Sequence, residues 1–333
     1  MKIIENISKF QLRDNYIIYY HQKGNIYINS DFNGDLLSNI EVKDCHWFFD
    51  DIKYLQIEEN GTIGYYSDNK LEKQLLNYYR PIVDNIGVAH VFSTYDSRLH
   101  TETLFHLPDE KQIINEWLPN NIYHISDKFW CNDTIADFKL IDIQKKEILW
   151  AIPQPEVMKP SGYKGLTNTK KVLGIYKNNL WIQLPDSRIL ALDKETGIIK
   201  YEIEHFYFSS IPEGIFLDQR GVIIIFHYNV YAEFCLDDKI FKIENIIGSE
   251  KELIIRHVTH HNGDKYLYFT GNKDNSFEPN VYGTFNTFKQ TFEFIREKEP
   301  EMGFFYQAPQ VNEELFTILD DKGNLIIHKR DEI

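Results

Sequence analysis

The densest group of side chains that could bind a metal or take part in catalysis is the histidine cluster His257-Val258-Thr259-His260-His261. Imidazoles are common ligands of zinc and other transition metals, so metal binding is the first chemistry to consider. In a β-strand, however, alternate side chains point to opposite faces. His257 then diverges from His260, and His260 from His261. We therefore expect no metal site at this cluster and no bound cofactor.

Paired acidic residues suggest acid–base catalysis of the glycosidase type, in which two carboxyl groups flank the bond to be broken. Each pair lies at or near an expected turn, where carboxylates are solvated rather than held against a substrate. Motifs of zinc proteases, serine hydrolases, dinucleotide-binding proteins and P-loop proteins are also absent from the sequence. No catalytic residue is assigned, and a non-enzymatic protein is favoured. The pairs are Asp50-Asp51, Asp237-Asp238, Glu313-Glu314 and Asp320-Asp321.

Long connections between expected strands are better candidates for a site, because binding residues concentrate in long loops on a rigid scaffold. Four such connections run from Thr94 to His100, Pro153 to Gly165, Asn272 to Pro279 and Glu297 to Gly303. Their seven carboxylates and five basic residues give no strong electrostatic field. The candidate partner-binding residues are Tyr95, Asp96, Glu156, Tyr163, Asp274, Glu278, Glu297, Glu299 and Glu301.

The elements that position these loops are β-strands. Short segments rich in Ile, Val, Tyr and Phe recur along the chain, as from Gly221 to Phe226 and from Lys265 to Thr270. Clusters of Asp, Asn, Lys and Gly separate them and are typical of turns, while helical periodicity is almost absent. We therefore predict an all-β fold, with most tryptophans packed in its core.

An internal repeat defines the architecture. The segment from Leu140 to Trp150 aligns without gaps with the segment from Ala191 to Tyr201. In both copies an Asp ends one strand, a polar turn follows, and an aromatic residue lies eight positions after the Asp. Looser copies, starting mostly about 35 to 50 residues apart, run through the rest of the chain, with room for two more strands between them. Repeats of this length, each with four antiparallel strands, are typical of propeller blades.

The better copy carries a family resemblance. Ala191-Leu192-Asp193-Lys194-Glu195-Thr196-Gly197 resembles the repeat of quinoprotein-like (PQQ-like) β-propellers, in which an Ala-Leu-Asp, Thr-Gly turn precedes a strand ending in Trp. Trp150 matches that Trp in the first copy, and Tyr201 replaces it in the second. The resemblance, within the wider superfamily that includes WD-type propellers, implies a β-propeller of four-stranded antiparallel blades. It does not imply the quinone, because the metal-ligand and disulfide features of quinone-binding members are missing.

Residues 1–333 are expected to form a single propeller domain, closed into a ring by both termini. Seven blades are preferred, in which case the first and last hairpins share one blade. Eight is the alternative, in which case a strand from Lys2 to Ile7 completes the last hairpin. With strands named A to D from the centre outwards, the four long connections are B–C and D–A loops, which leave from the same face.

Charge and cysteine content limit the kinds of partner and the cellular compartment that we expect for this protein. The sequence has 36 Lys and Arg against 50 Asp and Glu, a net charge of −14. This excess opposes binding to a phosphate backbone and favours a basic protein partner. Three well-separated cysteines, Cys45, Cys131 and Cys235, suggest buried thiols in a reducing compartment. With no secretion signal or membrane-spanning run recognised, we predict a cytoplasmic protein that is monomeric alone.

These observations favour a non-enzymatic, protein-binding propeller. A concrete form is an acidic immunity-type protein that binds and neutralises a basic toxin such as a nuclease. Two alternatives stay open. One is a carbohydrate-active hydrolase or lyase that uses carboxylates in the central funnel. The other is a scaffold with several partners.

Overall fold

The computed structural model describes residues 1–12, 17–21, 25–29, 38–41, 46–48, 53–57, 63–67, 70–75, 78–83, 88–94, 100–106, 111–116, 120–126, 128–134, 136–158, 162, 164–204, 214–247, 253–261, 263–274 and 276–333. Contacts divide the chain into two compact units. Unit 1 comprises Met1–Lys43 and Ser210–Ile333, and unit 2 comprises Asp44–Ser209. That the whole chain forms one domain stays a prediction.

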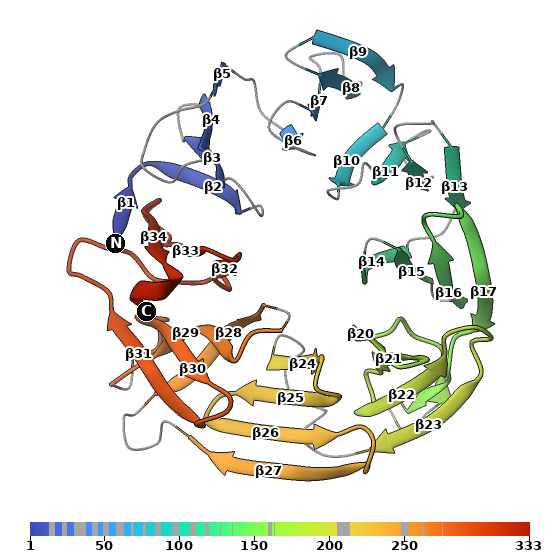
Figure 1. The fold of residues 1–333 in the computed structure, drawn as a ribbon. Helices are drawn as coiled ribbons and strands as arrows, with labels where there is room; N and C mark the ends of the chain where they lie inside the picture. The colour runs from blue at the N-terminus through green and yellow to red at the C-terminus, as the bar shows by residue number, and fades with distance from the viewer. Residues whose placement is uncertain are drawn as a thin grey trace. The chain divides into compact units, whose positions relative to one another are not determined.

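Unit 1 contains four sheets of four antiparallel strands (Figure 1). Their orders are β2-β3-β4-β5, β24-β25-β26-β27, β28-β29-β30-β31 and β32-β33-β34-β1. The strands are β1 (Lys2–Ile4), β2 (Ile7–Leu12), β3 (Ile17–His21), β4 (Asn25–Asn29), β5 (Ser38–Glu41), β24 (Ile215–Asp218), β25 (Val222–His227), β26 (Val230–Cys235), β27 (Ile240–Ile246), β28 (Ile254–His260), β29 (Tyr266–Asn272), β30 (Val281–Asn286), β31 (Thr291–Glu297), β32 (Gln310–Val311), β33 (Leu315–Leu319) and β34 (Leu325–Lys329), followed by the 3₁₀ turn η5 (Arg330–Glu332).

Unit 2 contains four further four-stranded antiparallel sheets, β6 to β9, β10 to β13, β14 to β17 and β20 to β23, and the two-stranded sheet β18-β19. The strands are β6 (His46–Phe48), β7 (Lys53–Ile57), β8 (Ile63–Ser67), β9 (Lys70–Leu75), β10 (Tyr78–Val83), β11 (Val88–Thr94), β12 (His100–His106), β13 (Lys111–Glu116), β14 (Asn120–His124), β15 (Phe129–Thr134), β16 (Asp137–Asp142), β17 (Glu147–Pro153), β18 (Val157–Met158), β19 (Lys164–Gly165), β20 (Lys171–Tyr176), β21 (Asn179–Gln183), β22 (Arg188–Asp193) and β23 (Ile199–Glu204).

The number of sheets differs from the preferred sequence prediction. The described residues contain eight four-stranded sheets, not seven. The difference arises at the chain ends, where β1 pairs antiparallel with β34 through the register Lys2↔Ile327 (Figure 1). The first hairpin therefore belongs to a separate sheet, β2 to β5, as the eight-sheet alternative requires. Both ends of the chain share one sheet, which was expected.

The repeat found in the sequence corresponds to a recurrent turn. At the end of the third strand, Asp193 Oδ1 accepts hydrogen bonds from the backbone nitrogens of Glu195 (3.1 Å) and Thr196 (3.0 Å). Asp142 Oδ1 accepts one from Lys145 at the equivalent position (2.9 Å). An Asp at this position accepts hydrogen bonds from backbone N–H groups of the turn that have no partner in the β-ladder. It therefore ends the strand and starts the hairpin to the fourth strand.

A tryptophan joins the two repeat copies. Trp150, on the outermost strand β17, donates its indole N–H to the carbonyl oxygen of Lys194 in the neighbouring sheet (2.8 Å). Its ring also lies against Gly197, which has φ +74°, and a Cβ at that residue would lie 2.9 Å from Trp150 Cδ2 and Ile152 Cγ2. Glycine is required here for both the left-handed backbone and the close approach of the ring. In the first copy the aromatic residue eight positions after the Asp thus makes a contact between sheets, whereas Tyr201 of the second copy is 40% exposed.

The cores lie between facing sheets of the same unit. In unit 2, one cluster joins Leu140 and Cys131 of one sheet to Ile182 and Leu192 of the next. In unit 1, three such clusters lie on the two sides of the β28–β31 sheet and between β2 and the β32–β1 sheet. Trp130, Trp150 and Trp181 are buried as predicted. Trp117 lies outside the described residues.

Two observations bear on compartment. Cys131 and Cys235 are buried free thiols, and Cys45 lies outside the described residues. Within the described ranges, no helix is long and apolar enough to cross a membrane. The cytoplasmic location stays a prediction.

The Trp150–Gly197 contact predicts unequal effects of two glycine substitutions. Gly197→Ala adds backbone strain and a clash with the indole, and is expected to destabilise the protein by roughly 2–4 kcal/mol. Gly263→Ala is the matched control, because Gly263 has φ +81° but its nearest neighbour, Gln219 Oε1, lies at an ordinary 3.5 Å. It is expected to lose about 1 kcal/mol. Urea unfolding measures both, and equal losses would contradict the packing role of Trp150.

Candidate functional site

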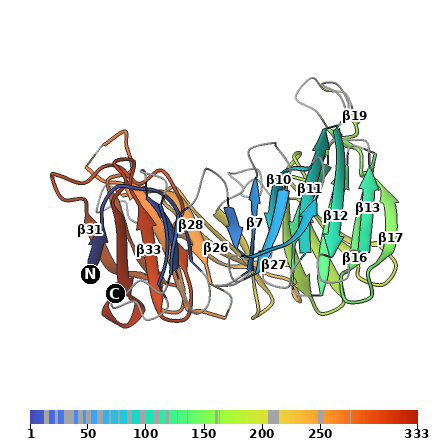
Figure 2. The ribbon, with the colours of Figure 1, turned by 90° about the horizontal axis from the view of Figure 1, so that it is seen from above.

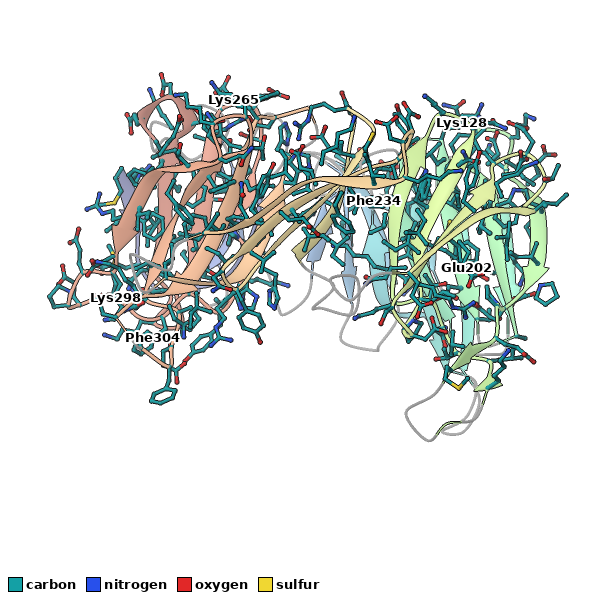
Figure 3. The ribbon with its side chains drawn as sticks, turned by 90° about the horizontal axis from the view of Figure 1, so that it is seen from below. Lys128, Glu202, Phe234, Lys265, Lys298 and Phe304 are labelled. Carbon is teal, nitrogen blue, oxygen red and sulfur yellow. The ribbon has the colours of Figure 1, made fainter. Side chains whose placement is uncertain are left out.

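Strand order locates the predicted loop residues. In unit 1, Asp274 and Glu278 lie between the second and third strands of one sheet, β29 and β30. Glu297 ends β31, and Glu299 and Glu301 follow it in the connection to β32 of the next sheet. Because the strands alternate in direction, both connections leave from the same edge. Figure 3 shows Lys298 and Phe304 of the second connection at one edge, and Lys265 at the opposite edge.

The connection from β29 to β30 is held by its own polar groups. Asn272 Nδ2 donates to the carbonyl oxygen of Ser276 (2.8 Å), and Ser276 Oγ donates to that of Glu278 (2.9 Å). Asn280 Oδ1 accepts the backbone N–H of Lys273 across the base of the loop (2.8 Å). These hydrogen bonds hold residues 273, 276, 278 and 280 in place outside the ladder. At its tip it presents Phe277, whose side chain is 95% exposed.

The connection from β31 to β32 packs against this loop. The backbone nitrogens of Lys298 and Phe305 donate to the carbonyl oxygens of Asn280 (2.8 Å) and Pro279 (2.9 Å). Phe305 is buried between the β28–β31 and β32–β1 sheets. Gly303 approaches the next turn so closely that a Cβ would meet Asp321 Oδ1 at 1.9 Å. The two connections thus form one structure.

Side chains strengthen the joint between the two loops. The Tyr306 hydroxyl donates to a carboxylate oxygen of Glu278. This hydrogen bond, with a smaller contribution from burial, raises the pKa of Tyr306 to about 12. Lys273 pairs with Glu297. The phenol stays neutral and bonded through the physiological pH range.

A third loop at this edge comes from the neighbouring sheet. Tyr228, in the turn between β25 and β26, exchanges two backbone hydrogen bonds with Ile255 of β28 (3.3 and 2.8 Å). The Arg256 guanidinium lies over the Tyr228 ring, 5.6 Å from its centroid, and Arg256 Nε donates to Asn272 Oδ1 (3.0 Å). Tyr228 is thereby linked to the base of the Phe277 loop.

These loops form one feature, which we call the aromatic loop surface. It consists of Tyr228 with Arg256, residues 273, 274 and 276–280, and residues 298–306. Its three prominent side chains are Phe277, Tyr228 at 44% exposure and Tyr306 at 47%. Tyrosine and phenylalanine in such positions are typical anchors of protein interfaces.

The charges of the aromatic loop surface are mostly engaged with one another. Lys273 is bound to Glu297, and Arg296 Nη2 lies 2.6 Å from Glu299 Oε1. Lys298 Nζ donates to the carbonyl oxygen of Met302 (3.1 Å). Most of the cations are thus engaged within the loops. The carboxylate of Glu301 is exposed and has no ion pair among the described residues.

The remaining predicted residues are not part of this group. Glu156 belongs to unit 2, in the long connection from β17 to β20, and Figure 2 shows β19 of this connection at one end of the strands of unit 2. There Arg188 pairs with Asp186 (2.7 Å) and donates to the Glu156 carbonyl oxygen. Tyr95, Asp96 and Tyr163 lie outside the described residues. The assignment of all nine to partner binding stays a prediction.

Several residues of the surface were not among the sequence candidates. Phe277 had a visible signal, since it is a lone aromatic in the polar segment from Lys273 to Asn280. Tyr306 follows the shorter loop considered from sequence, and Tyr228 and Arg256 lie at strand ends. Their contribution depends on contacts between sheets, which spacing in the sequence does not show.

The opposite edge of unit 1 is built differently. His260 Nε2 lies 3.3 Å from Asp218 Oδ2, while His261 Nε2 lies 3.0 Å from Glu313 Oε1. The histidines thus diverge to different partners. Among the described residues, no group of three or more His, Cys, Asp or Glu side chains is placed to hold a metal ion.

Comparisons with known structures identify the fold. The chain is similar to the C-terminal WD40 domain of Sif2, with a TM-score of 0.62, 8% identity and coverage of 98% of this chain and 96% of that chain. It is also similar to the computationally designed Ika8 protein, with a TM-score of 0.54, 11% identity and coverage of 98% and 96%. BamB from Moraxella catarrhalis gives a TM-score of 0.46, with 12% identity and coverage of 84% and 94%. No protein-family model and no curated protein sequence matches the chain.

The fold class is therefore confirmed. WD40 domains are β-propellers of four-stranded blades, and the chain has this all-β architecture. At 8% identity the similarity shows the fold alone. A fold hosts many functions, so the function has to be argued from the residues of a site. The narrower resemblance to quinoprotein-like repeats stays a prediction.

The polar network at the opposite edge predicts a pH-dependent loss of stability. Burial by itself raises the pKa of Asp218, but hydrogen bonds from His260 and Arg220 outweigh it and lower that pKa to about 2. Since the folded pKa lies below the unfolded value of 3.8, the ionised carboxylate stabilises the fold above about pH 4. This stabilisation is lost as the pH falls through about 2.

Asp218→Asn is thus expected to reduce the free energy of unfolding by about 1–2 kcal/mol at pH 7, and by less as the pH is lowered from 4 toward 2. Denaturant titrations at several pH values measure the difference. Asp331→Asn, which removes an exposed carboxylate from η5, is the control and is expected to change stability by under about 0.5 kcal/mol. A pH-independent deficit for Asp218→Asn would rule out this electrostatic role.

Proposed function

We propose that this protein is a non-enzymatic propeller that binds a basic protein partner through the aromatic loop surface of unit 1. The observation that carries the proposal is the presence of three exposed aromatic side chains on three connected loops at one edge. Loops that are already ordered lose little conformational entropy when a partner binds. The fold itself does not require large aromatic groups at these solvent-exposed positions.

Charge supports the choice of a basic partner. The net charge of −14 attracts a protein of opposite sign and speeds encounter. It also disfavours nucleic acid as a partner, because a phosphate backbone needs a basic surface. Within the aromatic loop surface, Lys273 and Lys298 are bound to groups of the loops themselves. The exposed carboxylates are then the charges left to meet a partner.

A concrete form of this function is an immunity-type protein that neutralises a basic toxin, with a nuclease as one example. A rigid acidic surface that covers a basic active site would block access of an anionic substrate by occupying it. Support for this form comes from the charge. Stoichiometric inhibition of the isolated partner's activity would establish it, and a partner without toxic activity would reject it.

The proposed site predicts that charge reversal acts locally. Glu301→Lys is expected to weaken partner binding several-fold, mainly through the association rate. Glu244→Lys is the matched control, because Glu244 is an exposed residue of β27 and its replacement changes the net charge equally. Partner captured from the producing cells with the wild-type chain is purified and titrated against both variants.

Salt provides the second readout. Binding is expected to weaken as NaCl rises from about 50 mM to about 300 mM, since exposed charges are screened over this range. Equal effects of Glu301→Lys and Glu244→Lys would mean that net charge acts without this site. Binding that is insensitive to salt would contradict a basic partner.

A further inference from the structure

Phe277 stands out among the exposed apolar residues. At 95% it has the highest exposure of the large hydrophobic side chains described, well above Phe288 at 64%. Single exposed apolar residues are common and need no explanation by themselves. Phe277 differs because of the loop that carries it and the groups that surround it.

The backbone on both sides of Phe277 is fixed. The carbonyl oxygen of Ser276 accepts Asn272 Nδ2 (2.8 Å), and the Ser276 hydroxyl donates to the carbonyl oxygen of Glu278 (2.9 Å). One residue later, the Pro279 carbonyl oxygen accepts the N–H of Phe305 (2.9 Å), which is buried. The phenyl ring thus projects from backbone that is held at residues 276, 278 and 279, which lowers the entropy that a partner has to remove when it buries the ring.

The groups around Phe277 have a defined polarity. Glu278 directs one carboxylate oxygen to the Tyr306 hydroxyl, Asp274 is exposed with its Oδ2 3.7 Å from Lys273 Nζ, and Glu301 is exposed. The nearby ammonium groups face inward: Lys273 binds Glu297, and Lys298 lies over the Phe304 ring, 5.0 Å from its centroid. Phe277 is thus followed directly by a carboxylate, and the two lysines of these loops are engaged within them. Interfaces commonly combine a buried aromatic anchor with a polar rim that excludes water.

We propose that Phe277 is the anchor of the interface and inserts into an apolar pocket of the partner protein, whose rim carries Lys or Arg side chains. The inference rests on the proposed function and adds to it the central residue and the complementary shape of the partner. Burial of the ring supplies the apolar contribution to affinity, and the basic rim pairs with Asp274, Glu278 and Glu301.

The first test is site-specific photo-crosslinking. The photoreactive analogue p-benzoylphenylalanine replaces Phe277 or, as control, Phe288, which is exposed in the turn after β30 at the opposite edge of the same sheet. The full chain is expressed and irradiated in the cells that produce it. We expect a crosslink from position 277 to apolar residues of a basic protein with Lys or Arg nearby, and none to that protein from 288. Crosslinks only from 288, only to a second copy of this chain, or none at all would overturn the proposal.

The second test measures affinity with the crosslinked partner after purification. Phe277→Ala is expected to weaken binding at least about 30-fold, which corresponds to about 2 kcal/mol, while Phe288→Ala changes it less than about threefold. Phe277→Trp keeps a large ring and is expected to retain most of the affinity. Thermal unfolding checks that each variant is folded, because Phe288 also contacts the Arg220 guanidinium (4.9 Å to the ring centroid).

The outcomes separate this inference from the proposed function. If Glu301→Lys weakens binding but Phe277→Ala does not, the acidic surface binds the partner and Phe277 is not its anchor. If neither variant affects a partner that binds the wild-type chain, both the site and the anchor are wrong. A loss for Phe277→Ala without any effect of salt would retain the anchor and reject the basic rim.

Discussion

Packing of side chains between sheets is the constraint on which this structure depends. Hydrogen-bonded ladders run within each sheet, and in the described strands the two residues Tyr228 and Ile255 form the isolated bridge between neighbouring sheets. Neighbouring sheets are therefore held together mainly by the side chains that project from their faces. Trp150 shows how specific this requirement is, because its ring needs a residue without Cβ at position 197 and its N–H needs the Lys194 carbonyl.

This constraint separates the roles of the two edges of unit 1. At one edge, ionised groups are turned toward each other: Arg220 bonds both Asp218 (2.8 Å) and Glu233 (2.9 Å), and Arg330 bonds Asp264. At the other edge the same scaffold supports longer loops whose polar groups bond one another and leave aromatic rings in solvent. The exposed aromatic residues are thus separate from the residues that stabilise the sheets, whereas Met302 and Phe305 of the second connection belong to the core.

Much of the fold was predictable because its signals are local. Short apolar segments between turn residues identify strands, and the spacing of Asp142 and Trp150 recurs at Asp193 and Tyr201. The number of sheets was harder to predict from the sequence, because β1 has only three residues and its partner β34 lies at the other end of the chain. The carboxylates of the loops were found because acidic residues are visible in any sequence. The contacts that these carboxylates make could not be predicted, because the Lys273–Glu297 and Tyr306–Glu278 contacts arise only when two connections fold against each other.

The pairing of β1 with β34 has a consequence for how the chain folds. Lys2 has to meet Ile327 before the last sheet is complete, and the Ile7 N–H donates to the Gly323 carbonyl oxygen (2.8 Å) to join this sheet to the β2–β5 sheet. During synthesis β1 therefore leaves the ribosome long before β34, the strand with which it pairs, has been made. Contacts of such sequence separation slow folding, because the chain entropy of closure has to be overcome before they form. The pairing of β1 with β34 is thus expected to be a slow step in the folding of unit 1.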